Sequence, residues 1–189
     1  MTELEIYINS YFNTAPDLTN KLSVLFKEEY LSKNDFHTKI GSRHSKLSFV
    51  KSGYLRVFKQ TENKEVTQWI SSQGEFTTDL NSIMFDQPAR WNIQALTDCE
   101  LYTISSEDYQ RLNELIPEWP SAERLFLGKC FLTLEDRVFS FLSLTAEQRY
   151  KLLFEHKKEL FNQIPLHYLA SMLGMTPETF SRIRKKPTS

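Results

Sequence analysis

Short strand-like segments follow one another between residues 29 and 104, and they limit the folds open to this chain. Hydrophobic and polar residues alternate from Leu47 to Phe58 around Ser52-Gly53, and polar turns are expected at 33–35 and 61–64. Similar segments occupy residues 30–32, 36–40, 65–70, 91–95 and 100–104. About seven or eight short strands at roughly 8–12-residue spacing, with no helical pattern among them, predict a small antiparallel barrel or β-roll. Such a roll either holds one small ligand or is filled by its own side chains.

Helical segments flank the strand region. Residues 3–13 and 17–28 precede it and carry apolar side chains at helical spacing. Ser105 can cap a helix that follows it, and Pro117 and Pro120 are expected to break that helix. The sequence therefore predicts an α+β fold, in which an antiparallel β-roll with flanking helices is followed by a long helix and a helical C-terminal domain.

The long helix is expected from about Ser121 to Leu142, and its apolar residues form a stripe. The stripe repeats in steps of four and three, as in a coiled-coil heptad, through Leu127, Phe131, Leu134, Val138 and Phe141. A helix that lies on the roll would produce such a stripe equally well. Further apolar residues widen it, namely Phe126, Cys130, Phe139 and Leu142. We therefore expect this helix to pack on two sides and to form the interface of a homodimer.

The stretch from Ile164 to Lys186 has the pattern of a helix-turn-helix. Its first helix carries apolar residues at helical spacing, namely Leu166, Leu169, Ala170 and Leu173. Gly174 suits a left-handed turn, and Thr176-Pro177 suits the start of a second helix. That second helix has an apolar face with Phe180 and Ile183, and its other face is polar and basic.

Two helices packed on a core would show the same pattern, and the charge distribution separates these interpretations. The net charge of −1 and the pI of about 6.4, taken alone, argue against a nucleic-acid binder. Residues 145–189, however, contain eight Lys or Arg and four acids, a balance of +4, whereas the preceding 144 residues contain 15 Lys or Arg and 20 acids, a balance of −5. A basic terminal part on an acidic body fits a DNA-binding module. The near-neutral total leaves a second interpretation open, a ligand-sensing or protein-interaction module that does not bind DNA.

No enzymatic or metal site can be recognised in the sequence. Cys99 and Cys130 are far apart and form neither a disulfide framework nor a zinc spacing, and the four His share no ligand spacing. We therefore expect a protein that is not an enzyme and has no cofactor and no metal. The acidic start Met-Thr-Glu-Leu-Glu-Ile lacks the positive region of a signal peptide, and no apolar run reaches membrane-spanning length. These features predict a cytoplasmic protein that does not associate with membranes.

The order of these elements resembles the Crp/Fnr family of bacterial transcription regulators over nearly the whole chain. Three segments carry the resemblance, namely Val50–Phe58 in the roll, Gly74-Glu75-Phe76 with Asp79-Leu80 and Gln94–Leu101 at the pocket, and Ala170–Ile183 in the helix-turn-helix. The resemblance implies a cyclic-nucleotide-binding-type β-roll in a sensor domain of residues 1–120, a dimerisation helix at 121–144 and a DNA-binding domain at 145–189. It further implies a homodimer that binds a palindromic operator in double-stranded DNA.

The second helix of the predicted helix-turn-helix matches a run that is frequent in this family, here Glu178-Thr-Phe-Ser181-Arg182. Glu178 can accept a hydrogen bond from cytosine N4, and Arg182 can donate two to guanine. Four residues apart, the two share one helical face, and their opposite charges can hold each other in register. Phosphate contacts are expected from Thr176, Thr179, Arg184, Lys185 and Lys186. Pro177 stands where some relatives have a base-contacting Arg, so the preferred DNA site can differ.

The effector pocket resembles the family less closely. Relatives that bind cyclic AMP have Gly-Glu-Leu and, further on, Arg-Ser or Arg-Thr, whose Glu and Arg hold the ribose and the phosphate. A gapless alignment puts Thr78-Asp79-Leu80 and Ala89-Arg90 at these positions. Arg90 is then displaced by one residue and faces the opposite side, unless the loop at 86–88 shifts by one. The candidate pocket residues are Gly74, Glu75, Phe76, Asp79, Leu80, Ala89 and Arg90. We expect an unidentified small-molecule effector, or none, in place of cyclic AMP.

Overall fold

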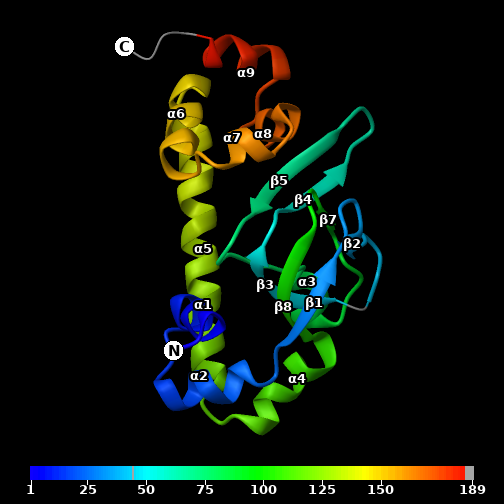
Figure 1. The fold of residues 1–189 in the computed structure, drawn as a ribbon, viewed down its shortest axis with the longest axis vertical. Coiled ribbons are helices and arrows are strands. Elements are labelled where there is room, and N and C mark those ends of the chain that lie inside the picture. The colour runs from blue at the N-terminus through cyan, green and yellow to red at the C-terminus, as the bar shows by residue number, and fades with distance from the viewer. Residues whose placement is uncertain (44, 186–189) are drawn as a thin grey trace.

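In the computed structural model, which describes residues 1–43 and 45–185, eight strands form two antiparallel sheets that make up a roll (Figure 1). One sheet has the strand order β1-β8-β3-β6, and the other has the order β2-β7-β4-β5. The strands are β1 (Lys27–Leu31), β2 (Phe36–Thr38), β3 (Lys46–Ser52), β4 (Leu55–Gln60), β5 (Glu65–Ser71), β6 (Phe76–Thr77), β7 (Asn92–Ala95) and β8 (Cys99–Ser105). The predicted antiparallel β-roll with flanking helices is confirmed.

The two sides of strand β3 contribute to different cores, because successive side chains of a strand point to opposite faces. Leu47 and Phe49 belong to a core that is shared with the N-terminal helices, whereas Val50 belongs to the core inside the roll. The inner core also contains Leu31, Leu55, Val57, Ile93, Ala95, Cys99 and Leu101. Side chains of the roll itself therefore fill this part of its interior.

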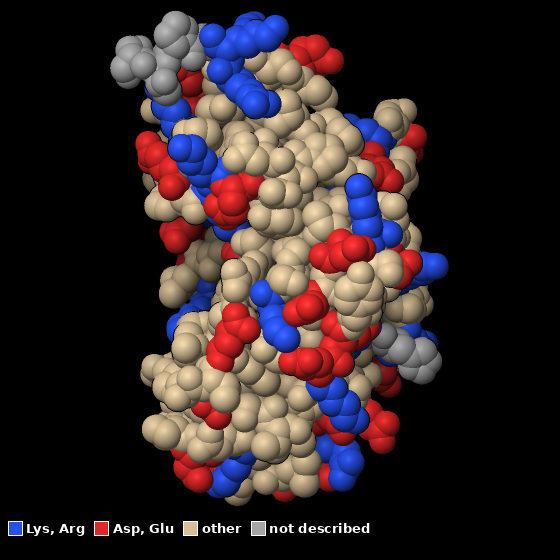
Figure 2. All heavy atoms as spheres, viewed as in Figure 1, with Lys and Arg blue, Asp and Glu red and all other residues tan. Residues whose placement is uncertain are grey.

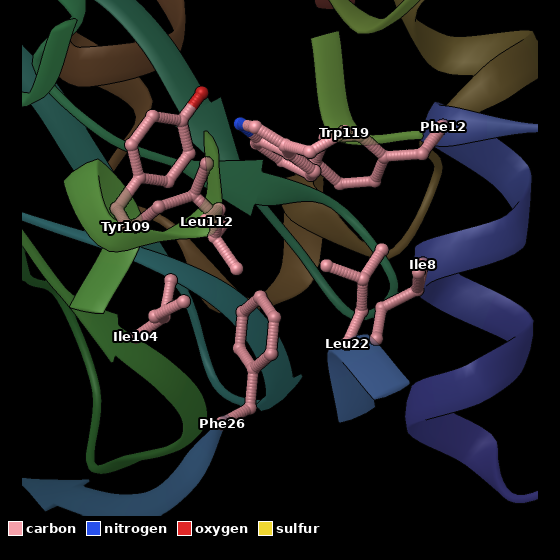
Figure 3. A pocket seen from close by; sticks show the side chains of 9 residues that line it. Ile8, Phe12, Leu22, Phe26, Ile104, Tyr109, Leu112 and Trp119 are labelled. Atoms are coloured by element: carbon pink, nitrogen blue, oxygen red, sulfur yellow. The ribbon is translucent and has the colours of Figure 1, made fainter. Parts of the chain in front are cut away.

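Four helices cover the outer side of the sheet that contains β3. They are α1 (Glu3–Phe12), α2 (Pro16–Ser23), α4 (Ser106–Leu115) and the first part of α5 (Trp119–Ser143). The rings of Phe12 and Trp119 pack with their centroids 5.2 Å apart. An apolar void of about 10 Å³ remains between these elements (Figure 3). It is no larger than a single water molecule, so it is not a ligand site.

The structure corrects three details of the predicted element order. A short helix, α3 (Leu80–Phe85), interrupts the strand region, where the sequence predicts no helix. The six residues of α3 are too few to show a helical period in the sequence. The helix starts at the cap formed by Asp79 and ends at Asp86, whose φ is +50°. The N-terminal helix predicted to reach residue 28 ends at Ser23, since strand β1 begins four residues later. Pro120 does not break α4 but lies in the first turn of α5, where its missing N–H costs nothing.

The C-terminal unit, residues 145–185, lies at the end of α5 that is remote from α1 and α2 (Figure 1). Its helices are α6 (Ala146–His156), α7 (Leu160–Gln163), α8 (Leu166–Met172) and α9 (Pro177–Arg184). Its core includes Leu160, Leu169 and Phe180, all fully buried, and Ile70 and Leu96 of the roll belong to the same core. The C-terminal unit is therefore packed against the roll.

Candidate nucleic-acid interface and effector pocket

Helices α8 and α9 meet at a tight turn, and α9 presents its polar side to solvent. Thr176 caps α9 as predicted, with its Oγ1 accepting the N–H of Thr179 at 3.2 Å. Phe180 and Ile183 are buried and anchor α9 on the C-terminal unit. The predicted DNA-contacting residues Glu178, Ser181, Arg182, Arg184 and Lys185 are exposed together with Thr176, and Thr179 is half-buried. Lys186, which belongs to the same predicted set, lies outside the described residues.

Glu178 is bound at the start of α9. Its own backbone N–H and the Thr176 hydroxyl donate hydrogen bonds to the carboxylate, and these bonds lower the pKa of Glu178 below its ordinary value. The carboxylate is therefore ionised at neutral pH and keeps lone pairs that can accept further hydrogen bonds. Among the described residues no ion pair joins Glu178 to Arg182. The opposite charges of Glu178 and Arg182, which the sequence indicates can hold each other in register, are therefore not paired in this structure.

Arginines from α5 and α6 brace the turn between α8 and α9. Gly174 has φ of +66°, as predicted for a left-handed turn, and a Cβ there would lie 2.6 Å from Cε1 of Phe141 on α5. Arg137 Nη2 donates to the carbonyl oxygen of Met172 at 2.7 Å. Arg149 Nε donates to the carbonyl oxygen of the following residue at 3.1 Å. These bonds satisfy carbonyl groups that have no partner within α8, because they lie at its C-terminal end.

Positive charge gathers around α9. Figure 2 shows Lys and Arg side chains at the end of the molecule where α9 lies, whereas acidic side chains are frequent over the roll. The exposed cations of α9 and its end are Arg182, Arg184 and Lys185. A cluster of this kind attracts phosphate groups whatever the base sequence.

Helix α5 leaves a broad apolar face uncovered. Of the predicted stripe, Phe131, Leu134 and Val138 are 62%, 46% and 57% exposed, while Leu127 packs partly on the N-terminal core. The exposed apolar face also includes Leu125, Leu132, Phe139, Phe141 and Leu142. Large apolar side chains that gather on one exposed surface are typical of an interaction site.

Asp79 is the central residue of the predicted effector pocket, and backbone groups of the chain bind its carboxylate. Oδ1 accepts the N–H of Ser82 at 3.0 Å. Oδ2 accepts the N–H groups of Arg90 at 2.7 Å and Trp91 at 3.0 Å. The residue is 1% exposed. Asp79 therefore ties the start of α3 to the segment that leads into β7, and its carboxylate is turned away from solvent.

The other predicted pocket residues do not converge on one cavity. Ala89 is buried, and the side chain of Arg90 is exposed. Four further candidates face other parts of the molecule. Gly74, Phe76 and Leu80 lie against the N-terminal helices, and Glu75 pairs with Lys157 of the C-terminal unit. The structure thus brings Asp79 and Arg90 together only through the backbone of Arg90.

A buried polar cluster, which the sequence does not reveal, connects the two sheets. Nδ1 of His37 on β2 lies 2.9 Å from Thr38 Oγ1, and its Nε2 lies 2.8 Å from Ser48 Oγ on β3. Ser48 Oγ is also 2.7 Å from Thr103 Oγ1 on β8. Burial of the ring, with a smaller effect of Lys46, lowers the pKa of His37 to about 3. The imidazole is therefore neutral at physiological pH.

Comparison with known proteins agrees with this architecture. Residues 28–114 match the family model of the cyclic nucleotide-binding domain. The roll has the fold of a cyclic nucleotide-binding domain. None of the curated proteins matches the sequence of the chain.

Several solved structures of Crp/Fnr-family regulators share the fold of most of the chain. The catabolite activator protein of Thermus thermophilus is 21% identical, with 94% of this chain and 84% of that chain covered and a TM-score of 0.59. The c-di-GMP-responsive global regulator CLP of Xanthomonas campestris is 18% identical, with 90% of each chain covered and a TM-score of 0.67. FixK2 of Bradyrhizobium japonicum is 16% identical, with 84% of this chain and 82% of that chain covered and a TM-score of 0.69. At these identities the similarity concerns the fold.

The predicted pocket residues of this cyclic-nucleotide-binding-type roll offer no buried cation to a cyclic phosphate. Such a phosphate is held by charge-assisted hydrogen bonds from a cation or from free N–H groups. The Arg90 side chain is exposed, and its N–H is already bonded to Asp79. Arg56, which is buried, contacts Tyr168 of α8 outside the roll. At the predicted pocket, therefore, the roll presents no buried cation to its interior.

Neither of two cavities found in the structure involves the predicted pocket. A surface hollow of about 240 Å³ is lined by Glu28, Glu29, Tyr30, Lys51, Glu100 and Leu101. The void in Figure 3 lies between the N-terminal helices, the sheet of β3 and β8, and helices α4 and α5. Within residues 1–43 and 45–185, no three His, Cys, Asp or Glu are grouped so that they could hold a metal ion. In the same residues, no helix is both long and apolar enough to span a membrane.

The replacement Asp79→Ala is expected to destabilise the fold by about 3 kcal/mol, because it removes a helix cap and leaves two further N–H groups without their acceptor. Urea unfolding followed by tryptophan fluorescence measures this change. Asp35→Ala is the matched control, since Asp35 is exposed and its side chain has no hydrogen bond among the described residues. A variant Asp79→Ala as stable as the control would contradict the assigned structural role.

Proposed function

We propose that this protein is a homodimeric, sequence-specific DNA-binding transcription regulator of the Crp/Fnr type. In this proposal, residues 145–189 form a helix-turn-helix domain, residues 121–144 form the dimerisation helix and residues 1–120 form a sensor domain. The observation that carries the proposal is the exposed polar face of α9, on which Glu178 and Arg182 lie four residues apart.

The shape and charge of the α8–α9 pair support α9 as the recognition helix. Phe180 and Ile183 fix the helix on its core, so its other side is free to enter a major groove. Glu178 and Arg182 are suited to contact base edges, whereas the remaining exposed polar residues are suited to contact phosphates. The braced turn at Gly174 keeps α9 in a fixed orientation to α8.

The exposed apolar face of α5 supports a two-fold dimer formed by this helix. Two copies of α5 packed along this face would cover Phe131, Val138 and their apolar neighbours. The two recognition helices would then enter successive major grooves about 34 Å apart on one side of the duplex. The operator is therefore expected to be palindromic.

The geometry of the roll supports either an effector other than cyclic AMP or no small-molecule effector. The exposed side chain of Arg90 and the bound carboxylate of Asp79 leave the phosphate and the ribose of a cyclic nucleotide without their partners. Selection of bound duplexes from a random pool, with and without cyclic AMP, tests both parts of the proposal. A palindrome enriched in both conditions supports it, an enrichment that requires cyclic AMP contradicts the effector assignment, and no enrichment in either condition contradicts DNA recognition.

Two substitutions in and beside α9 are expected to separate base contacts from phosphate contacts. Arg182→Ala should cost about 1–3 kcal/mol on the selected palindrome and relax the preference at one base pair. Lys185→Ala should weaken binding to all duplexes about equally and make the salt dependence less steep. Binding titrations at several salt concentrations, on the palindrome and on single-base variants, measure both effects. If both variants bind like the unsubstituted protein, α9 is not the recognition helix.

A further inference from the structure

One arginine of the roll is buried on the side that faces the C-terminal unit. The neighbours of Arg56 on β4, Leu55 and Val57, point into the roll, so the side chain of Arg56 points out of it. Arg56 is nevertheless only 1% exposed. Its Nη1 donates to Glu65 Oε2 at 2.7 Å, and its Nε donates to Thr67 Oγ1 at 2.9 Å, both on β5. A buried guanidinium needs such partners, because removal of a charge from water is costly.

Two aromatic rings from different parts of the chain enclose the same guanidinium. Its Cζ lies 4.1 Å from the ring centroid of Phe58 on β4 and 3.9 Å from that of Tyr168 on α8. A planar guanidinium can lie flat between two aromatic faces, whereas the ammonium group of a lysine is attracted to a ring only as a compact charge. Since Tyr168 belongs to the C-terminal unit, Arg56 is enclosed only while α8 lies on the roll.

Hydrogen bonds of the β5 backbone join the same contact. Strand β5 is the outermost strand of its sheet, and the N–H of Thr67 donates to Ser171 Oγ on α8 at 2.9 Å. Figure 1 shows the hairpin of β4 and β5 reaching up beside α8. Nearby, Lys157 Nζ pairs with Glu75 Oε2 at 2.5 Å, which adds an ion pair between the C-terminal unit and the roll.

We propose that Arg56 is a positioning residue for DNA binding, which holds α8 on the β4–β5 hairpin and so fixes the orientation of α9 relative to α5. The inference rests on the proposed function. The exposed side chains of α9 take no part in the contact, so the contact orients α9 without covering it. Fixed orientation matters when both recognition helices of a dimer must meet two half-sites at once, and it does not matter for a single half-site.

The variant Arg56→Met tests this role, because it removes the charge and the donors but keeps a long, unbranched side chain. For the intact chain, we expect binding to a duplex with both half-sites to weaken by about tenfold or more, since only a fraction of molecules then has both recognition helices oriented. Binding to a duplex with one half-site should stay within about twofold of the unsubstituted protein. Arg56→Lys should not restore binding, because lysine cannot stack between the two rings. Lys59→Met, at an exposed cation on the same strand, is the matched control and should behave like the unsubstituted protein.

Hydrogen exchange of the Thr67 amide gives a readout without DNA. Its N–H is bonded to Ser171 only while α8 is docked, so Arg56→Met should speed its exchange by about tenfold. Tyr168→Leu should have a similar effect alone and add little to Arg56→Met, because both changes remove one contact.

The outcomes separate this inference from the proposed function. Unchanged Thr67 exchange, or equal losses on the two duplexes, would overturn the positioning role. If the unsubstituted protein selects no duplex, the proposed function fails, and the exchange measurement still decides whether Arg56 holds α8 on the roll.

Discussion

The variant Val138→Asp is expected to be monomeric and to lose high-affinity binding to a palindromic duplex. Val138 is 57% exposed and lies within the apolar face of α5, between Phe131 and Phe141. In a two-fold pair of helices each aspartate would be buried near its own copy, without a cation to pair with. Because Val138 is exposed in the protomer, the fold of the protomer should lose little stability. Sedimentation equilibrium should therefore give the mass of one chain, 22.3 kDa, instead of twice that value.

Loss of the dimer should weaken binding to the palindromic duplex by about 100-fold or more, because the second half-site is no longer bound by a linked recognition helix. Thr133→Asp is the matched control, since Thr133 is exposed on the same helix but lies away from the apolar stripe. This control should remain dimeric and bind the duplex normally. A dimeric Val138→Asp variant with full affinity would show that α5 does not form the interface.

Acidification is expected to weaken the fold through His37. Burial holds its pKa at about 3 in the folded chain, below the ordinary value of about 6.5 that it has when unfolded. The folded state therefore binds fewer protons, so the contribution of His37 to stability is fully present above pH of about 6.5 and is lost as the pH falls toward 3. The slope in this window approaches about 1.4 kcal/mol per pH unit, or about 2–3 kcal/mol between pH 6.5 and pH 4.5. Urea unfolding at a series of pH values measures it.

The variant His37→Gln should make this pH dependence less steep, because glutamine can bond to Ser48 but does not titrate. His156→Gln, at an exposed histidine of α6, removes one imidazole without changing the interior of the roll and should keep the slope of the unsubstituted protein. Lys46, the charged residue that also lowers the pKa of His37, is paired with Glu29 and is unchanged in both variants. If the stability of His37→Gln and that of the unsubstituted protein fall equally as the pH is lowered, His37 is not the cause of the pH dependence.

Elements with strong local signals could be predicted from the sequence. The cap at Ser105, the cap at Thr176 and the left-handed glycine at position 174 all have the predicted geometry. Each depends on residues within one turn of chain, so no knowledge of the tertiary structure is needed. The β-roll was predictable for a related reason, because alternation and turn residues repeat along the strand region.

Features that depend on distant residues could not be predicted. Arg56 stands between two apolar residues of a strand and carries the pattern of a solvent-exposed side chain, and only the docking of α8 buries it. Ser48 becomes a neighbour of His37 only through the closure of the roll, and Thr103 becomes a neighbour of Ser48 only through the pairing of β3 with β8. Glu75, a candidate pocket residue, pairs with Lys157 of the C-terminal unit. In each case the contact joins segments whose proximity no local pattern specifies.

The position of α8 along β5 has a consequence for solubility. An outermost strand carries N–H and C=O groups that can pair with a strand of another molecule, which is a common route to aggregation. In this chain α8 covers that strand, and the N–H of Thr67 is bonded to Ser171. Any rearrangement that lifts α8 from the roll therefore also exposes the edge of β5. A protein whose C-terminal unit is released in this way can aggregate, because the exposed edge can pair with a strand of another molecule.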